Sequence, residues 1–299
     1  MRILIIHNPT AGRRRRKLLE HVIEGLVLRG AAVEVIPTEG PGHATALARK
    51  AAFGSDPADV VVAAGGDGTI NEVAAGLVDS QVPLAVIPAG SANVLARDLG
   101  LFGMFGPAPD RVISAIVDGQ AQPIWLANVE TDDTKSKFAV MLGGGYDGAV
   151  VARVGANIKR RLGRMAFVWA GLKALVGHPG RPVCLEVGDR DFSAGWVIAS
   201  NARHYAGPFV LARDVEFDRR GVTIFAMKNR SRLSLIGYMI WLALGRLDKL
   251  KTVERIETDR FVLNGPYRSP IQTDGDFLGD RETSVSIDEE PIRVMAFGG

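Results

Sequence analysis

The sequence predicts an α/β protein with two parts: an N-terminal Rossmann-like domain built on a parallel sheet, and a C-terminal β-rich domain. Up to residue 118, short apolar runs alternate with helical patterns. This alternation is typical of a parallel sheet with helices on both faces. Beyond that point, strand-like runs recur between Gly, Asp and Asn turns, as in an antiparallel sandwich or barrel. The predicted domains are residues 1–122 and 123–299, with the boundary between Gly119 and Pro123.

The elements of the N-terminal domain follow a regular order. Apolar runs bounded by Gly or Pro predict buried strands, and apolar spacing of three and four residues predicts helices. In such sheets, ligands bind beyond the carboxyl ends of the strands. The predicted strands are residues 2–7, 32–36, 60–64 and 83–88, and the predicted helices are residues 14–28, 43–52, 70–77, 91–99 and 111–118.

The sequence predicts that the C-terminal domain consists mainly of strands, with two helical insertions. No internal repeat or low-complexity segment is visible in it. The predicted strands are residues 124–130, 137–142, 183–187, 192–199, 222–227, 260–263 and 293–297, and the insertions are residues 150–176 and 233–244.

Composition indicates a folded globular protein. The chain has 299 residues, 47% of them apolar and 23% charged, which suits two domains with ordinary cores. The single cysteine, Cys184, excludes an internal disulfide and fits a reducing compartment. The apolar run at residues 1–6 is too short for a signal peptide. The longest apolar stretch, residues 233–245, is shorter than the ~18–20 residues that cross a bilayer. We therefore expect a cytoplasmic protein, and leave peripheral attachment at the inner membrane surface open.

The net charge of +3 is small, but the basic residues are clustered at residues 13–17, 159–164 and 228–232. Such clusters can contact phosphate, anionic lipid or nucleic acid, or can simply form solvated helix faces. The chain shows no zinc-ligand spacing, no aromatic-rich basic sheet motif and no basic coiled coil, so we expect no nucleic acid partner. The apolar stretch at residues 230–246 has basic flanks, and two interpretations stay open: a membrane-docking helix, or a helix packed over the second domain.

The most informative stretch begins where the strand at residues 60–64 ends. Gly65, Gly66 and Gly68 let the backbone turn sharply and approach a ligand closely. Backbone amides in such a turn, followed by a helix N-terminus, bind phosphate oxygens. Asp67 is the side chain in this turn that could interact with a metal ion or a hydroxyl group. It could alternatively act as a helix N-cap.

Two other strand-end loops have similar turn chemistry, at residues 8–12 and 88–93. Parallel strands of one sheet end at the same edge, so we expect all three loops to lie close together. The three loops together predict a phosphate-binding site at this edge.

These motifs resemble the catalytic domain of diacylglycerol kinases, which sphingosine kinases, ceramide kinases and soluble bacterial lipid kinases share. The similarity continues through residues 145–147, 201–208 and 273–276, and so spans nearly the whole chain in order. The Gly-Gly-Asp-Gly-Thr motif alone is less specific, because NAD kinases carry it and phosphofructokinases carry a close relative. The residues after it, 71–73, together with the 88–93 loop and the later Asp-Gly pair, favour the lipid kinases.

The resemblance implies an active site in the cleft between the two domains. It implies transfer of the γ-phosphoryl group of ATP, with Mg²⁺, to a hydroxyl of a diacylglycerol-like or sphingoid lipid at a membrane surface. Asp274 is the implied general base, and Asp67 and Asp276 are the implied ligands of metal and phosphate. A homodimer is left open. The candidate nucleotide-binding residues are Asn8, Thr10, Gly65, Gly66, Gly68, Thr69, Asn71, Glu72, Gly90, Ser91 and Asn93.

The chain departs from the usual family pattern at several positions. Asp276 stands where the family has Glu, and Val94 stands where it has Asp. A structural magnesium site near residues 214–218 is doubtful, because the expected Asp-Gly pair there is separated. His204 and Tyr205 are candidates for contact with the acceptor, whereas Asp147 reads as a turn or structural carboxylate. Two other functions stay open: an NAD kinase-like kinase of a soluble polyol, and a non-catalytic nucleotide or lipid sensor.

Overall fold

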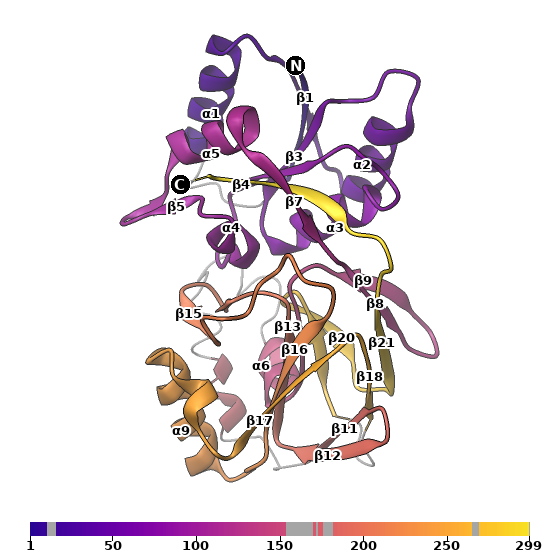
Figure 1. Ribbon diagram of the computed structural model, residues 1–299, viewed down its shortest axis with the longest axis vertical. Coiled ribbons are helices and arrows are strands. Elements are labelled where there is room, and N and C mark those ends of the chain that lie inside the picture. The colour runs from indigo at the N-terminus through magenta and orange to yellow at the C-terminus, as the bar shows by residue number, and fades with distance from the viewer. Residues whose placement is uncertain (11–15, 154–169, 172, 176–181, 265–268, 299) are drawn as a thin grey trace. The chain divides into compact units, whose positions relative to one another are not determined.

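A six-stranded sheet forms the centre of the first of two units in the computed structural model (Figure 1). The structure describes residues 1–10, 16–153, 170–171, 173–175, 182–264 and 269–298. The predicted basic cluster at residues 159–164 lies outside these residues, as does most of the cluster at residues 13–17 and most of the helical insertion at residues 150–176. The first unit contains Met1–Leu126, Phe217–Arg219 and Glu289–Gly299, and the second contains Ala127–Glu216 and Arg220–Asp288.

The strand order of the first sheet is β2-β1-β3-β4-β22-β7. All strands except β7 run parallel, and β7 is antiparallel to β22. Every residue of β3 and β4 is buried, because helices cover both faces of a parallel sheet. The strands are β1 (Arg2–His7), β2 (Ala32–Pro37), β3 (Val60–Gly65), β4 (Leu84–Pro88), β7 (Gln120–Ile124) and β22 (Ile292–Ala296).

Helices α1 and α5 pack together on one side of this sheet, and α2 and α3 pack together on the other (Figure 1). Glycines permit these close approaches: a Cβ atom on Gly25 would lie 2.4 Å from Ile113 Cδ1, and one on Gly76 would lie 2.5 Å from the Thr45 carbonyl oxygen. The predicted parallel α/β sheet is therefore confirmed. The helices are α1 (Arg16–Leu28), α2 (His43–Phe53), α3 (Asp67–Gly76), α4 (Val94–Asp98) and α5 (Pro109–Asp118).

One strand lies in a different sheet from the one we expected. The segment at residues 293–297 was predicted within the C-terminal β-rich part, but β22 lies in the first sheet between β4 and β7. Similarly, the single strand predicted at residues 124–130 is two strands: β7 pairs in the first sheet and β8 in the second unit. The chain therefore leaves the first sheet through β7 and returns through β22, which pairs along the whole of β7.

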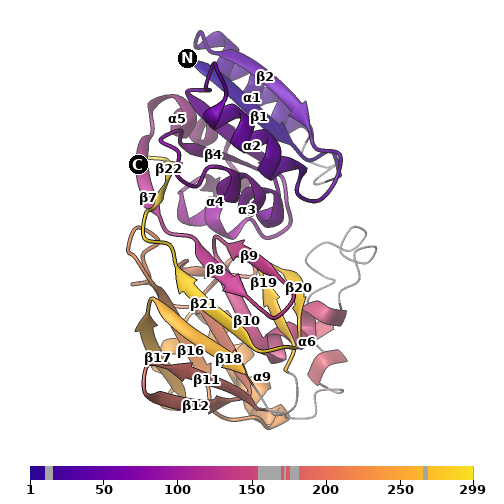
Figure 2. The same cartoon turned by 90° about the vertical axis from the view of Figure 1, so that its right-hand side faces the viewer.

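The second unit contains two six-stranded sheets, in the orders β17-β16-β13-β10-β19-β20 and β12-β11-β18-β21-β8-β9 (Figure 2). Every pairing in them is antiparallel, as the sequence predicted. The strands of the first are β10 (Met141–Gly145), β13 (Trp196–Ser200), β16 (Val222–Met227), β17 (Val253–Thr258), β19 (Ile271–Thr273) and β20 (Asp276–Gly279). Those of the second are β8 (Ala127–Glu130), β9 (Lys135–Phe138), β11 (Val183–Val187), β12 (Arg190–Ala194), β18 (Arg260–Asn264) and β21 (Thr283–Ile287).

The two sheets contact each other at β10. A Cβ atom on Gly144 would lie 3.3 Å from Leu263 of β18 and 3.5 Å from Val183 of β11. The segment predicted as one strand at residues 192–199 is divided into β12 and β13, which belong to different sheets, with Gly195 between them. Two short hairpins complete the strands: β5 (Phe102–Gly103) with β6 (Gly106–Pro107), and β14 (His204–Tyr205) with β15 (Phe209–Val210).

Helices α6 (Tyr146–Arg153) and α9 (Arg232–Ala243), and a 3₁₀ helix at Leu247–Lys249, belong to the second unit. Tyr146 and Trp196 belong to a buried cluster, with ring centroids 5.1 Å apart in an edge-on arrangement. None of the helices within the described residues has the length and apolar character needed to cross a bilayer.

Candidate active site

The loop that follows β1 is hydrogen-bonded to the end of β3 and to the first turn of α3. The backbone N–H of Asn8 donates to the Ala64 carbonyl over 3.0 Å, and Asn8 Nδ2 donates to Thr69 Oγ1 over 3.1 Å. Asn8 Oδ1 accepts from both the backbone N–H and the hydroxyl of Thr10, at 3.0 and 2.8 Å. β1 and β3 are adjacent strands at the point where the strand order reverses, which is where open α/β sheets bind ligands.

The loop after β4 joins the loop after β3 through the backbone. The N–H groups of Ala89 and Gly90 both donate to the Gly65 carbonyl, at 2.9 and 3.0 Å. A Cβ atom on Gly90 would lie 2.4 Å from Gly66 Cα, so a side chain at this position cannot fit without movement of the loops. The described residues of all three predicted loops, which exclude residues 11 and 12, are therefore joined at one edge of the sheet.

Asp67 connects the start of α3 to the start of α4. Its Oδ2 accepts from the backbone N–H of Asn93 over 2.9 Å, and its Oδ1 accepts from that of Val94 over 2.7 Å. The N-cap of α3 is Gly66, so the interpretation of Asp67 as the cap of its own helix was wrong. The carboxylate instead satisfies amides at the start of α4, where it also complements the positive end of the helix.

Asn93 is buried and holds the backbone of Gly90 from both sides. Its Oδ1 accepts from the Gly90 N–H over 2.9 Å, and its Nδ2 donates to the Gly90 carbonyl over 2.8 Å. Its φ of 49° places it in the left-handed region, which asparagine tolerates well. The helix predicted from residue 91 therefore begins only at Val94, and Ser91 is exposed in the loop.

The remaining candidates of the first unit lie on α3. Gly68 and Thr69 belong to its first turn, whose N–H groups have no partner within a helix and can serve an anion. Glu72 has a structural contact: its Oε2 accepts from the Ala44 N–H over 3.2 Å, and its carbonyl accepts from Thr45 Oγ1 over 2.9 Å. Glu72 thus links α3 to the start of α2 through these two hydrogen bonds. Asn71 is half-buried on the same helix.

In the second unit, Asp274 lies in the tight turn between β19 and β20. Its φ of 46° and the Gly275 φ of 86° are both in the left-handed region. Its carboxylate accepts from three successive backbone N–H groups: Ala139 at 2.9 Å, Val140 at 3.1 Å and Met141 at 2.9 Å. These hydrogen bonds fix the orientation of the carboxylate.

A buried network lies beside this turn. Gln272 Oε1 accepts from the Gly275 N–H over 2.7 Å, and Gln272 Nε2 donates to Asp147 Oδ2 over 2.8 Å. The Tyr205 hydroxyl donates to Asp147 Oδ1. The network therefore runs from Tyr205 through Asp147 and Gln272 to the backbone of the Asp274 turn.

Asp147 sits in an environment that opposes its charge. Burial raises the pKa of Asp147 to about 6, although the hydrogen bonds from Tyr205 and Gln272 lower it. Burial and the neighbouring Asp147 hold the pKa of Tyr205 well above its usual value. Glycine makes room for this carboxylate, because a Cβ atom on Gly143 would lie 1.6 Å from Asp147 Oδ2.

We expect Asp147→Asn to change how stability depends on pH. The folded protein holds the proton of Asp147 up to about pH 6, whereas an unfolded chain releases it near pH 3.9. Stability associated with Asp147 is therefore present below about pH 4 and is lost as pH rises through 6. A shift of about two units corresponds to roughly 3 kcal/mol, so between about pH 4 and pH 7.5 the variant should gain up to that much over wild type. Urea unfolding of both proteins at the two pH values measures the gap, and a constant gap contradicts the prediction.

Residues 2–129 match the family described as the diacylglycerol kinase catalytic domain. The "Probable lipid kinase YegS-like" of Xanthomonas campestris pv. campestris is 30% identical over 236 residues, which cover 74% of this chain and 73% of that protein. The chain belongs to the diacylglycerol kinase catalytic-domain family. It is a member of a family of lipid kinases.

Other members of the family are similar over different lengths. A diacylglycerol kinase of Bacillus subtilis is 35% identical over 191 residues, which cover 62% of this chain and 59% of that protein. A diacylglycerol kinase of Mycobacterium tuberculosis is 25% identical over 300 residues, covering 98% of this chain and 94% of that protein. A crystal structure of a diacylglycerol kinase from Bacillus anthracis shares the fold, with a TM-score of 0.69 at 17% identity, covering 99% and 96% of the two chains.

Kinases of this kind are expected to use a divalent cation with the nucleotide. The described part of the chain has no cluster of three or more His, Cys, Asp or Glu side chains suited to a metal ion. Mg²⁺ that arrives with a nucleotide usually takes one or two carboxylates, with phosphate and water oxygens completing the octahedron. Single carboxylates such as Asp67 and the exposed Asp276 fit that requirement. Asp214, by contrast, is paired with Arg255 over 2.7 Å, which holds the pKa of Asp214 below its usual value.

Asp147 is a buried structural carboxylate, as predicted from the sequence, whereas its partner Gln272 was not among the predicted site residues. The run Gly143-Gly144-Gly145, which ends two positions before Asp147, is an available signal, because consecutive glycines in a strand indicate close approach of another group. Tyr205 was a candidate for acceptor contact, and the structure gives its hydroxyl a partner in Asp147.

Proposed function

We propose that this family member is an ATP-dependent lipid kinase that transfers the γ-phosphoryl group to a hydroxyl of a diacylglycerol-like or sphingoid lipid. The observation that carries the proposal is the joining of three strand-end loops at the switch point of the first sheet. Family membership supports the same conclusion. The lipid at a membrane surface and the nucleotide are the proposed partners.

The first unit would hold the triphosphate. Gly66 carries no side chain, so phosphate oxygens can approach the backbone of this turn directly. The Gly90 N–H already donates to Gly65 and Asn93, so Gly90 contributes by letting the two loops touch. The N-terminal turn of α3 adds the partial positive charge of a helix end. Asp67 keeps the loops in place through α4, and Asn8 does so through Thr69. Phosphoryl transfer depends mainly on such positioning and on neutralisation of charge.

Asp274 would accept the proton of the attacking hydroxyl. As the oxygen of the lipid bonds to phosphorus and the bond to the leaving diphosphate breaks, the hydroxyl proton passes to a carboxylate oxygen of Asp274. Three amide hydrogen bonds hold this carboxylate in a fixed orientation. Positioning is the main requirement, because a loose transition state requires little nucleophilic push from the acceptor. Bound Mg²⁺ would neutralise phosphate charge, with Asp67 and Asp276 as its proposed protein ligands.

The direct test is transfer of labelled phosphate from ATP to a panel of acceptors. We expect phosphorylation of at least one detergent-dispersed lipid when Mg²⁺ is present, and none of NAD or glycerol. Transfer to NAD alone would replace the proposal with a soluble-acceptor kinase. Nucleotide binding measured by calorimetry, with no transfer to any acceptor, would replace it with a non-catalytic sensor.

A further inference from the structure

Helix α9 carries an apolar stripe that is exposed along its length. Leu233, Ile240 and Leu244 are 82%, 54% and 64% exposed, and Ile236 between them is also exposed. Their spacing of three and four residues places them on one side of the helix. A surface helix ordinarily carries polar residues on its exposed side. The exposed side of α9 is apolar instead.

The opposite side of α9 is anchored in the core of the second unit. Leu235, Tyr238 and Leu242 are buried in the cluster that contains Tyr146 and Trp196. The helix is therefore fixed in place, and the exposure of its outer stripe is a property of the folded unit.

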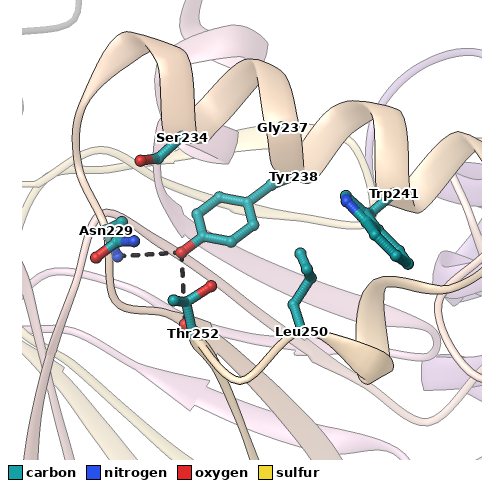
Figure 3. A pocket seen from close by; sticks show the side chains of 7 residues that line it. All are labelled: Asn229, Ser234, Gly237, Tyr238, Trp241, Leu250 and Thr252. Atoms are coloured by element: carbon teal, nitrogen blue, oxygen red, sulfur yellow. Dashed lines mark hydrogen bonds between the residues drawn. The ribbon is translucent and has the colours of Figure 1, made fainter.

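Beside this anchor lies an open hollow of about 190 Å³ (Figure 3). The Tyr238 hydroxyl accepts from the Asn229 N–H over 3.2 Å and donates to the Thr252 carbonyl over 3.4 Å. With these polar groups paired, the wall presents mainly the rings of Tyr238 and Trp241 and the side chain of Leu250. A half-buried tryptophan beside an apolar stripe is typical of the boundary between lipid and water.

Positive charge lies at both ends of the stripe. Residues 228–251 contain more basic side chains than acidic ones, and the acidic Asp248 pairs with Lys249 over 3.4 Å. Arg230 precedes the helix and Arg246 follows it, at opposite ends of the stripe. Lys228 is compensated by Glu254, at 2.8 Å. An apolar stripe with arginines at its ends is complementary to anionic headgroups above acyl chains.

We propose that this surface, the α9 face (Leu233, Ile236, Ile240 and Leu244 with Arg230 and Arg246), docks on a bilayer that contains anionic lipid. The inference deepens the proposed function and rests on it for its purpose, because a kinase of membrane lipids must meet its acceptor at a bilayer. A second copy of the chain fits the face less well. Two α9 faces packed together would bring arginines against arginines, whether the helices ran parallel or antiparallel.

Vesicle sedimentation without nucleotide or acceptor lipid tests the surface. Wild-type protein should bind vesicles of phosphatidylcholine and phosphatidylglycerol, and should bind pure phosphatidylcholine more weakly. The variant Leu233→Ser/Ile240→Ser should bind at least about 100-fold more weakly, because two large apolar side chains no longer enter the bilayer. The variant Arg230→Gln/Arg246→Gln should lose roughly 10-fold or more on the anionic vesicles and little on the neutral ones.

The matched control uses an exposed apolar pair elsewhere, at the turn of the β5–β6 hairpin. Met104→Ser/Phe105→Ser should bind like wild type, although both side chains are almost fully exposed. The proposal would be overturned if this control lost vesicle binding while Leu233→Ser/Ile240→Ser retained it. It would also be overturned by wild-type protein that binds no vesicles, or by a wild-type dimer that Leu233→Ser/Ile240→Ser dissociates in analytical ultracentrifugation.

Kinase activity on a short-chain diacylglycerol in detergent separates this proposal from the proposed function. All three double variants should match wild type in that assay, because none alters the strand-end loops or the Asp274 turn. Vesicle binding without any kinase activity would support membrane docking by the α9 face and contradict the proposed reaction. Activity in detergent without vesicle binding would support the proposed reaction and overturn the proposal for the α9 face.

Discussion

Replacing Asp274 with Asn should lower the turnover number for lipid phosphorylation by roughly 10²–10⁴-fold, the range expected when a general base is removed. The backbone should tolerate the change, because asparagine adopts the left-handed conformation that Asp274 requires. The affinity for ATP should stay close to that of wild type, since the phosphate-binding loops are untouched. Steady-state kinetics on the best lipid of the panel, together with calorimetry of ATP binding, measure both quantities.

A structural explanation must be separated from the chemical one, because the carboxamide in Asp274→Asn cannot accept all three amide bonds. Its Oδ1 could still accept from Val140 and Met141, but its NH₂ group would face the Ala139 N–H donor. Gln272→Ala is the matched control, since it removes the acceptor for the Gly275 N–H and loosens the same turn while Asp274 keeps its carboxylate. We expect a loss of about 10-fold in turnover for this control, the effect of imperfect positioning. Equal losses in the two variants would assign Asp274 a positioning role, and turnover within about 10-fold of wild type in Asp274→Asn would remove it from the reaction.

The parts of the site that could be predicted are those that local sequence specifies. The β3 strand, the glycine turn and α3 follow one another within residues 60–76, and each has its own pattern. The meeting of three loops could also be predicted, because β1, β3 and β4 are neighbouring parallel strands that end at one edge. Short-range periodicity and turn chemistry therefore suffice for the phosphate-binding edge of the first sheet.

The parts that could not be predicted depend on pairings between distant segments. Asp147 reaches Gln272 because β10 pairs with β19 in a register that places Gly143 opposite Gln272. No local pattern contains that register. The position of β22 has the same origin: its own residues indicate a strand, but only its pairing with β4 and β7 assigns it to the first sheet. The contact of Asp67 with the start of α4 likewise joins segments that are distant in the sequence.

The second large effect is expected at Gly90, where two of the three loops touch. In Gly90→Ala, the new methyl group would lie 2.4 Å from Gly66 Cα and 2.8 Å from Asn93 Oδ1. Neither neighbour can move easily, because Gly66 caps α3 and the buried Asn93 side chain holds the backbone of Gly90. The loops must therefore separate, and the amides that would receive the triphosphate shift with them.

We expect kcat/KM for ATP to fall by about 100-fold in Gly90→Ala, since displacement of a positioning group by about 1 Å can cost that much. Gly103→Ala is the matched control in the same unit: its methyl group would meet Ala108 Cβ at an ordinary 3.6 Å, and its activity should be unchanged. Thermal unfolding of both variants shows whether the first sheet persists, which we expect because the change lies in a loop beyond the ends of its core strands. A Gly90→Ala protein with wild-type kinetics would mean that the loops after β3 and β4 do not form the triphosphate site, because a methyl group cannot enter their contact without displacing it.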